Sequence, residues 1–160
     1  MRDILMTNDI QIREAAVTDL PACATIVNDY IDETPWLPRT ISHAKLEQIF
    51  NAEMLQSRFF LVAKSNNAVA GYLSMEEAIG KIHGLYVAAR YRGAGVGKAL
   101  MAACKKRYRE PVNLTVFEPN KEALRFYQRE GFVEVPEKRE ADTEEGVPTL
   151  FMQWSGDDQA

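Results

Sequence analysis

A glycine-rich stretch occupies residues 90–98 and reads Arg90-Tyr91-Arg92-Gly93-Ala94-Gly95-Val96-Gly97-Lys98. Its three alternating glycines lie between an apolar segment typical of a strand and one typical of a helix. Glycine allows a tight turn and a close approach of the backbone to a ligand. The first N–H groups of the following helix have no acceptor in the helix, and the helix dipole is positive there. The stretch therefore predicts an anion site, for which phosphate is the usual ligand.

Two common phosphate-binding motifs fit this stretch poorly. A dinucleotide fingerprint requires G-x-G-x-x-G, but the spacing here is G-x-G-x-G and Lys98 stands where the third glycine should be. A Walker A loop requires G-x-x-x-x-G-K-[ST], but Arg92 replaces the first glycine and Ala99 replaces the hydroxyl residue that would bind magnesium. An ATP site without either motif stays open as an alternative.

Length and composition indicate an ordinary globular protein. The 160 residues predict a single domain over 1–160, with a core from about 10 to 154 and polar tails at 1–9 and 155–160. The net charge of -4 argues against nucleic-acid binding. Residues 1–9 lack the apolar segment of a signal peptide, and no apolar run reaches membrane-spanning length. We therefore expect a cytoplasmic protein that does not bind membranes.

The two cysteines, Cys23 and Cys104, each lie in a helix-like apolar pattern. Their surroundings predict buried thiols in a reducing compartment, and no Cys/His spacing indicates a metal site.

Hydrophobic periodicity predicts an α+β fold with a mixed, mostly antiparallel central sheet of about seven strands flanked by helices. Asn120 is expected to cap a helix that Gly131 ends, and residues 137–146 are expected to form a weakly ordered charged loop. The other expected helices start near Thr18 or Asp19 and span about 42–55 and the segment after the glycine stretch. The expected strands lie at 10–12, 59–63, 69–75, 81–87, 112–117, 132–135 and 150–154.

Two motifs together resemble the GNAT superfamily of N-acetyltransferases. The pattern R-x-x-G-x-G, formed by Arg92, Gly95 and Gly97, is similar to the acetyl-CoA loop of that family. Residues 120–132 resemble its second signature, which consists of an Asn, an Ala and a Tyr followed by Gly-Phe. The resemblance covers about residues 10–154 and implies a GNAT fold with acetyl-CoA as the acetyl donor and no metal.

The resemblance also implies roles for the matched positions. Backbone groups of Leu85 and Val87 should pair with the pantetheine arm, and N–H groups from Arg92 to Lys98 should bind the pyrophosphate. Asn120 should contact the arm, and Ala123 and Phe126 should line its path. The cofactor-binding residues expected on this basis are Leu85, Tyr86, Val87, Arg92, Gly93, Ala94, Gly95, Val96, Gly97, Lys98, Asn120, Ala123, Phe126 and Tyr127.

Acetyl transfer to an amine requires a base and an acid. In the family, the position of Tyr127 often carries the acid that protonates the leaving thiolate, although without the resemblance Tyr127 would be taken as a half-buried core tyrosine. Base candidates are His83, then Glu76, with Glu77, Glu118 or a water as alternatives. Strand alternation predicts that His83 shares a face with Leu85 and Val87.

The acceptor pocket lacks a recognisable motif. Glu33 and Trp36, in or near the Pro-flanked segment at 34–38, are candidate substrate residues for a cationic amine, while Trp36 could equally pin its loop to the core. The resulting hypothesis is direct acetyl transfer to the primary amine of a small or amino-acid-like molecule. The alternatives are a protein or peptide amine as acceptor, or a non-catalytic acyl-CoA-binding module. Dimers are common in the family, so a homodimer is one expected assembly.

Overall fold

The structure, a computed structural model, describes residues 9–156. Apart from residues 9, 155 and 156, the expected polar tails lie outside this part of the chain. Short 3₁₀ helices occur at Val17–Asp19, Ala89–Tyr91 and Pro136–Lys138. The remaining elements, in chain order, are β1 (Ile10–Glu14), α1 (Leu20–Glu33), α2 (His43–Ile49), α3 (Ala52–Ser57), β2 (Phe59–Ser65), β3 (Ala68–Glu76), β4 (Lys81–Val87), α4 (Val96–Arg107), β5 (Val112–Phe117), α5 (Lys121–Arg129), β6 (Val133–Glu134) and β7 (Thr149–Trp154).

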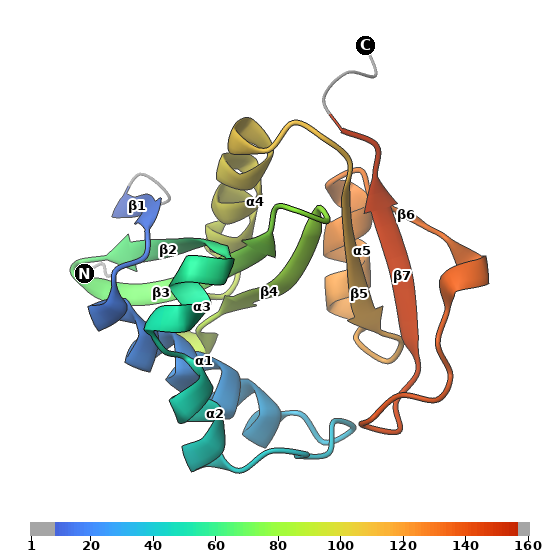
Figure 1. The fold of residues 1–160 in the computed structure, drawn as a ribbon, viewed down its shortest axis with the longest axis horizontal. Coiled ribbons are helices and arrows are strands. Elements are labelled where there is room, and N and C mark those ends of the chain that lie inside the picture. Colours follow the sequence, from blue (N-terminus) through green and yellow to red (C-terminus); the bar gives the residue numbers. More distant parts are fainter. Residues whose placement is uncertain (1–8, 157–160) are drawn as a thin grey trace.

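Within the described residues seven strands form one sheet in the order β1-β2-β3-β4-β5-β7-β6, which confirms the expected α+β fold. Every neighbouring pair is antiparallel except β4 and β5, which are parallel and share only the register pair Lys81↔Asn113. The Asn113 N–H donates to the Gly80 carbonyl at 2.8 Å and closes this end. Beyond it the two strands diverge, as Figure 1 shows, so the sheet opens into a wedge.

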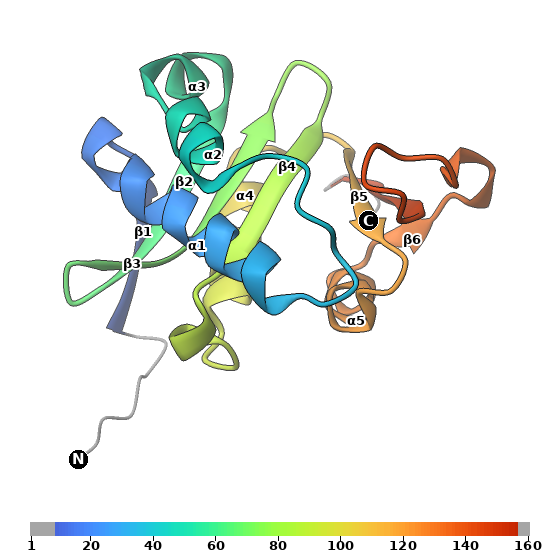
Figure 2. The ribbon, with the colours of Figure 1, turned by 90° about the horizontal axis from the view of Figure 1, so that it is seen from below.

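Helices cover both faces of the β1–β4 half. On β2, Phe60 and Val62 pack with α1 and α2, while Leu61 and Ala63 pack with α4. This alternation follows from the two-residue period of a strand. In the view of Figure 2, the segment between α1 and α2 runs across the open end of the wedge toward β5 and α5.

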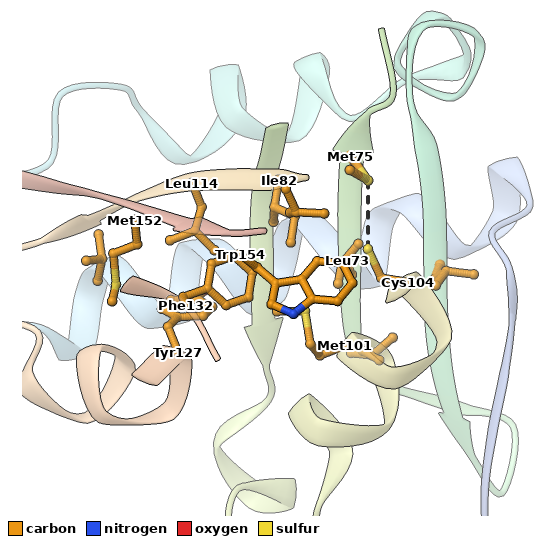
Figure 3. Close-up of a cluster of buried hydrophobic side chains, with 14 of the residues drawn as sticks. Leu73, Met75, Ile82, Met101, Cys104, Leu114, Tyr127, Phe132, Met152 and Trp154 are labelled. Carbon is orange, nitrogen blue, oxygen red and sulfur yellow. Dashed lines mark hydrogen bonds between the residues drawn. The ribbon is translucent and has the colours of Figure 1, made fainter. Parts of the chain in front are cut away.

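One hydrophobic core joins the two halves of the sheet. Trp154 of β7 belongs to the same buried cluster as Leu73 of β3 and Phe132, which follows α5. Figure 3 shows the Trp154 indole among these side chains, with Tyr127 close to Phe132. In this cluster Cys104 is fully buried, as predicted, and its Sγ lies 3.7 Å from Met75 Sδ.

Three expectations about local structure are wrong. The helix expected over 42–55 is two helices, because Asn51 adopts an extended backbone and its side chain accepts the Met54 N–H, which starts α3 anew. The strand expected at 132–135 is reduced to Val133–Glu134. Residues 137–146 are ordered: Glu140 bridges to Thr149, and the Gly146 N–H donates to the Thr143 carbonyl at 3.0 Å.

Candidate active site

The glycine stretch forms a turn that leads into the N-terminus of α4. Gly93 and Gly95 have φ values of 81° and 84°, in the left-handed region where other residues are strained. Gly95 is the N-cap of α4, so the N–H groups of Val96, Gly97 and Lys98 have no acceptor within the helix. These donors and the positive end of the helix dipole make an anion cradle at the open end of the wedge.

Gly97 also permits close packing of α4 against α5. A Cβ atom at Gly97 would lie 3.6 Å from the Phe126 ring and 3.8 Å from Val87. Both distances are ordinary van der Waals contacts, so this space admits a single methyl group, whereas a larger side chain would push these groups apart.

The edge of β4 that faces β5 has free backbone groups. The Ala88 N–H donates to the Ala70 carbonyl at 2.8 Å, and Tyr86 stands opposite Tyr72 in the register. In an antiparallel ladder the intervening residues point the other way, so the N–H and C=O groups of Leu85 and Val87 face the wedge. Within residues 9–156 no strand pairs with this edge at Leu85 or Val87, because β5 meets β4 only at Lys81, and this stretch of edge suits an extended ligand arm. Arg92 Nε donates to the Val87 carbonyl at 3.2 Å.

A bulge in β4 changes the faces that strand alternation predicts. Ser74 pairs with Gly84 and Met75 pairs with Ile82, so β4 has one more residue than β3 at this point. As a result Ile82 and Leu85 both pack against the cluster on the α4 side. The expectation that His83 lies on the face of Leu85 and Val87 is therefore wrong, because His83 is the extra residue of the bulge.

The bulge brings His83 to Glu76 at the end of β3. His83 Nε2 lies 2.9 Å from Glu76 Oε1, and His83 lines the cavity described below. The structure thus joins the first two base candidates into one pair. The alternatives are engaged elsewhere: Glu77 accepts from Arg107 at 3.1 Å, and Glu118 accepts from Arg139, which lowers the pKa of Glu118.

A cavity of about 560 Å³ fills the wedge. It is bounded by β4, β5, α5, the end of α1, the segment between α1 and α2, and Glu145 from the segment before β7. The expected site residues that line it are His83, Leu85, Tyr86, Val87, Arg92, Gly97, Asn120, Ala123, Phe126 and Tyr127. Gly93, Ala94, Gly95, Val96 and Lys98 belong to the adjoining cradle.

Tyr127 is buried and lines this cavity. Burial raises the pKa of the Tyr127 hydroxyl, and the neighbouring Tyr86 and Tyr30 raise it further. Among the residues that the structure describes, none forms a hydrogen bond with this hydroxyl. A protonated donor without a protein partner thus borders the cavity, as an acid for a leaving group would require.

Asn120 connects α5 with α1 across the cavity. Its side chain caps α5 by accepting the Ala123 N–H at 3.2 Å, and its Nδ2 donates to the Tyr30 hydroxyl at 3.0 Å. The ring of Tyr30 packs edge-on against Tyr86 at 5.4 Å. Sequence reasoning did not find Tyr30, because only the tertiary fold brings the end of α1 to Asn120.

The two candidate substrate residues are not part of the cavity. Glu33 accepts a hydrogen bond from Arg92 at 3.3 Å, and Trp36 packs on Phe117 of β5 with ring centroids 5.8 Å apart. Trp36 thus holds its loop against the sheet, and its neighbours Leu37 and Pro38 line the cavity instead. Neither residue lines the cavity, so their roles in binding the acceptor stay predictions.

The wedge between two parallel strands, the β4 edge that faces it and the anion cradle are the features expected of the donor site of an acetyl-CoA-dependent acetyltransferase. The family model described as an acetyltransferase (GNAT) domain matches residues 26–155. The chain therefore belongs to the GNAT acetyltransferase family, as the two sequence motifs indicated, and it uses acetyl-CoA as acetyl donor.

Individual relatives agree with this assignment. The chain is 27% identical over 148 residues to peptidyl-lysine N-acetyltransferase YiaC of Escherichia coli, which covers 89% of the chain and 95% of YiaC. Its fold matches yncA of Salmonella typhimurium, solved with its cofactor acetyl-CoA, with a TM-score of 0.72, 22% identity and coverage of 94% and 96%. Ribosomal-protein-alanine N-acetyltransferase of Brucella melitensis matches with a TM-score of 0.69, 25% identity and coverage of 91% and 99%.

Residues 9–156 contain no group of three or more His, Cys, Asp or Glu side chains that could bind a metal ion. None of their helices is long and apolar enough to cross a membrane.

Proposed function

We propose that this protein transfers an acetyl group directly from acetyl-CoA to the primary amine of a small molecule. The observation that carries the proposal is that one cavity contains both the free β4 edge and the His83 and Tyr127 side chains. Donor-binding and proton-transfer groups therefore face one space, in which an acceptor amine can reach a thioester. Within residues 9–156, both cysteines are buried, and burial raises the pKa of Cys104 to about 11, so neither thiol suits an acyl-enzyme route.

In this proposal the donor lies along β4. The N–H groups at the start of α4 bind its pyrophosphate, and the free groups of Leu85 and Val87 pair with its pantetheine arm. Asn120 and Phe126 border the path of the arm toward Tyr127. When bound, acetyl-CoA would supply the activated acetyl group.

Two side chains would move protons. A carboxylate only accepts hydrogen bonds, so Glu76 requires a proton on Nε2 of a neutral His83, which leaves Nδ1 as the acceptor. Nδ1 can then take the proton of the attacking amine, directly or through a water. Tyr127 donates its proton to the departing thiolate.

The boundaries of the acceptor end favour a small molecule. Leu37 and Pro38 line the cavity on one side, and the contact between Trp36 and Phe117 holds their loop in place. The cavity volume of about 560 Å³ lies in the range of small-ligand sites. A second candidate is a lysine side chain of a peptide, which the name of YiaC favours.

The direct experiment follows thiol release from acetyl-CoA with a panel of amines and identifies the acetylated product by mass spectrometry. The proposal expects one acetylated amine for each thiol released. Release of thiol without an acetylated amine, or tight CoA binding with no turnover on any small amine, would contradict it.

A further inference from the structure

Two carboxylates line the cavity: Glu122 from the exposed first turn of α5, and Glu145 from the segment before β7. This segment is held in a hydrogen-bonded turn: the Thr143 hydroxyl donates to the Val147 carbonyl at 2.7 Å and accepts the Val147 N–H at 3.1 Å. Val147 is buried and anchors the turn. Glu145 is therefore presented to the cavity from a fixed backbone.

Glu145 has no cationic partner among residues 9–156. It is half-buried, and none of the ion pairs or hydrogen bonds in that part of the chain involves its carboxylate. Burial raises the pKa of Tyr86 to about 12, and the negative charge of Glu145 is close enough to Tyr86 to contribute to this rise. A half-buried charge without a partner is unfavourable, so this position indicates a cationic ligand.

Glu145 and His83 lie at different depths of the wedge. His83 is two residues from Lys81, which pairs with Asn113 at the closed end, whereas Phe117 pairs with Thr149, just after the Glu145 turn, at the open end. From Asn113 to Phe117 the strand rises by about 13 Å. His83 sits part of the way along this rise, so an acceptor that reaches from one residue to the other needs a chain of several carbon atoms.

The segment between α1 and α2 gives the cavity a mostly apolar wall. Leu37, Pro38 and Ile41 line the cavity there, with Thr40 as the one polar side chain of that segment. Methylene groups suit such a wall, because burying them is favourable and leaves no polar group unpaired.

We infer that Glu145 binds a second positive charge on the acceptor, so that the preferred substrates are aliphatic molecules with a cationic group several carbons from the reacting amine. This inference rests on the proposed function and names the substrate class of the same site. The amine that reacts is deprotonated at His83, while the distal ammonium stays charged and pairs with Glu145.

The test compares 1,5-diaminopentane with pentylamine, which has the same chain but lacks the second amine. For the wild-type protein we expect a kcat/KM at least about tenfold higher for the diamine, because a hydrogen bond to a charged group is worth that much. In Glu145→Gln this preference should disappear, while kcat/KM for pentylamine and CoA affinity stay unchanged. Glu144→Gln is the matched control, because Glu144 is adjacent, exposed and outside the cavity.

Other outcomes overturn the inference in distinguishable ways. An equal kcat/KM for both amines, or an equal loss of kcat/KM for both in Glu145→Gln, would show that Glu145 does not bind a second positive charge. Either result would leave the proposed function intact. Loss of the preference in Glu122→Gln but not in Glu145→Gln would assign the charge to the other carboxylate that lines the cavity. Turnover of neither amine by a protein that binds CoA would remove the proposed function and this inference together.

Discussion

His83 Nε2 lies 2.9 Å from Glu76 Oε1, and the bulge of β4 creates this contact. Without the extra residue, His83 would not fall opposite the end of β3 with its ring at the cavity. The pair links the acceptor cavity to a second hollow, of about 420 Å³, which Glu76 lines together with Arg58 and Arg107. When His83 takes a proton from the amine, the Glu76 carboxylate therefore lies next to the protonated ring, on the side away from the substrate.

Replacing His83 by Gln should lower kcat by about 100-fold or more, because a positioned base contributes that much to proton transfer. Glu76→Gln should have a smaller effect, since the amide can still accept from Nε2 but carries no charge. Steady-state thiol release measures both. Glu77→Gln is the control, because Glu77 bonds Arg107 outside the active site. Wild-type activity in the His83→Gln variant would indicate that a water, and not His83, is the base.

Tyr127→Phe should lower kcat by about 100-fold with little change in the KM for acetyl-CoA, because the ring stays packed and only the acid is lost. Burial raises the pKa of Tyr127 above the ordinary value of about 10, so the hydroxyl keeps its proton into alkaline solution. The wild-type kcat should therefore show no loss from this group up to about pH 10. Tyr108→Phe, outside the cavity, serves as control. An unchanged kcat would make Tyr127 a packing residue.

Gly95→Asp should weaken CoA binding by more than 100-fold, because it places a negative charge at the start of α4, where like charges cost several kcal/mol. Gly95 also has a φ of 84°, so any side chain adds strain. Gly95→Ala measures the strain alone and should lose much less affinity. Calorimetric titration with CoA compares the three proteins, with thermal unfolding as the check on folding. Equal affinities would place the pyrophosphate elsewhere.

Asp19→Asn should destabilise the protein by about 1–3 kcal/mol at pH 7, because the carboxylate accepts hydrogen bonds from Arg13 and the Ala16 N–H. Burial alone would raise the pKa of Asp19, but these hydrogen bonds and Lys64 outweigh it, and the pKa is lowered. The stabilisation is therefore complete above the unfolded-state pKa of about 3.9 and is lost as the pH falls through the lower folded-state value. Urea unfolding of both proteins at pH 7 and in acid checks this. A difference that does not shrink in acid would contradict the assignment.

The parts of the fold that depend on local chemistry could be predicted from the sequence. Asn120 caps α5 and Gly131 ends it with a φ of 95°, as expected from residues a few positions away. Asn66 and Asn67, both with positive φ, form the turn between the expected strands β2 and β3, and Asn adopts this conformation more readily than most residues. The turn at the glycine stretch could likewise be predicted, because glycine readily adopts positive φ values.

The parts of the fold and site that depend on pairing between distant segments could not be predicted from the sequence. The bulge at His83 arises from the register of β4 against β3, which no local pattern encodes. Glu33 and Trp36 carry side chains that suit a cationic amine, but tertiary contacts direct them to Arg92 and Phe117. Glu145 lies in the charged segment 137–146, which has no hydrophobic periodicity, so only the fold shows that Glu145 borders the cavity.

The most direct test of the central claim is a comparison of kcat/KM for acetyl transfer to 1,5-diaminopentane and to a lysine peptide with blocked termini. Both carry a primary amine on an aliphatic chain, but only the diamine is a small molecule with a second charge. The small-molecule proposal expects the diamine to be the better substrate by at least about tenfold. A higher kcat/KM for the peptide would contradict it and would make this protein a peptide acetyltransferase.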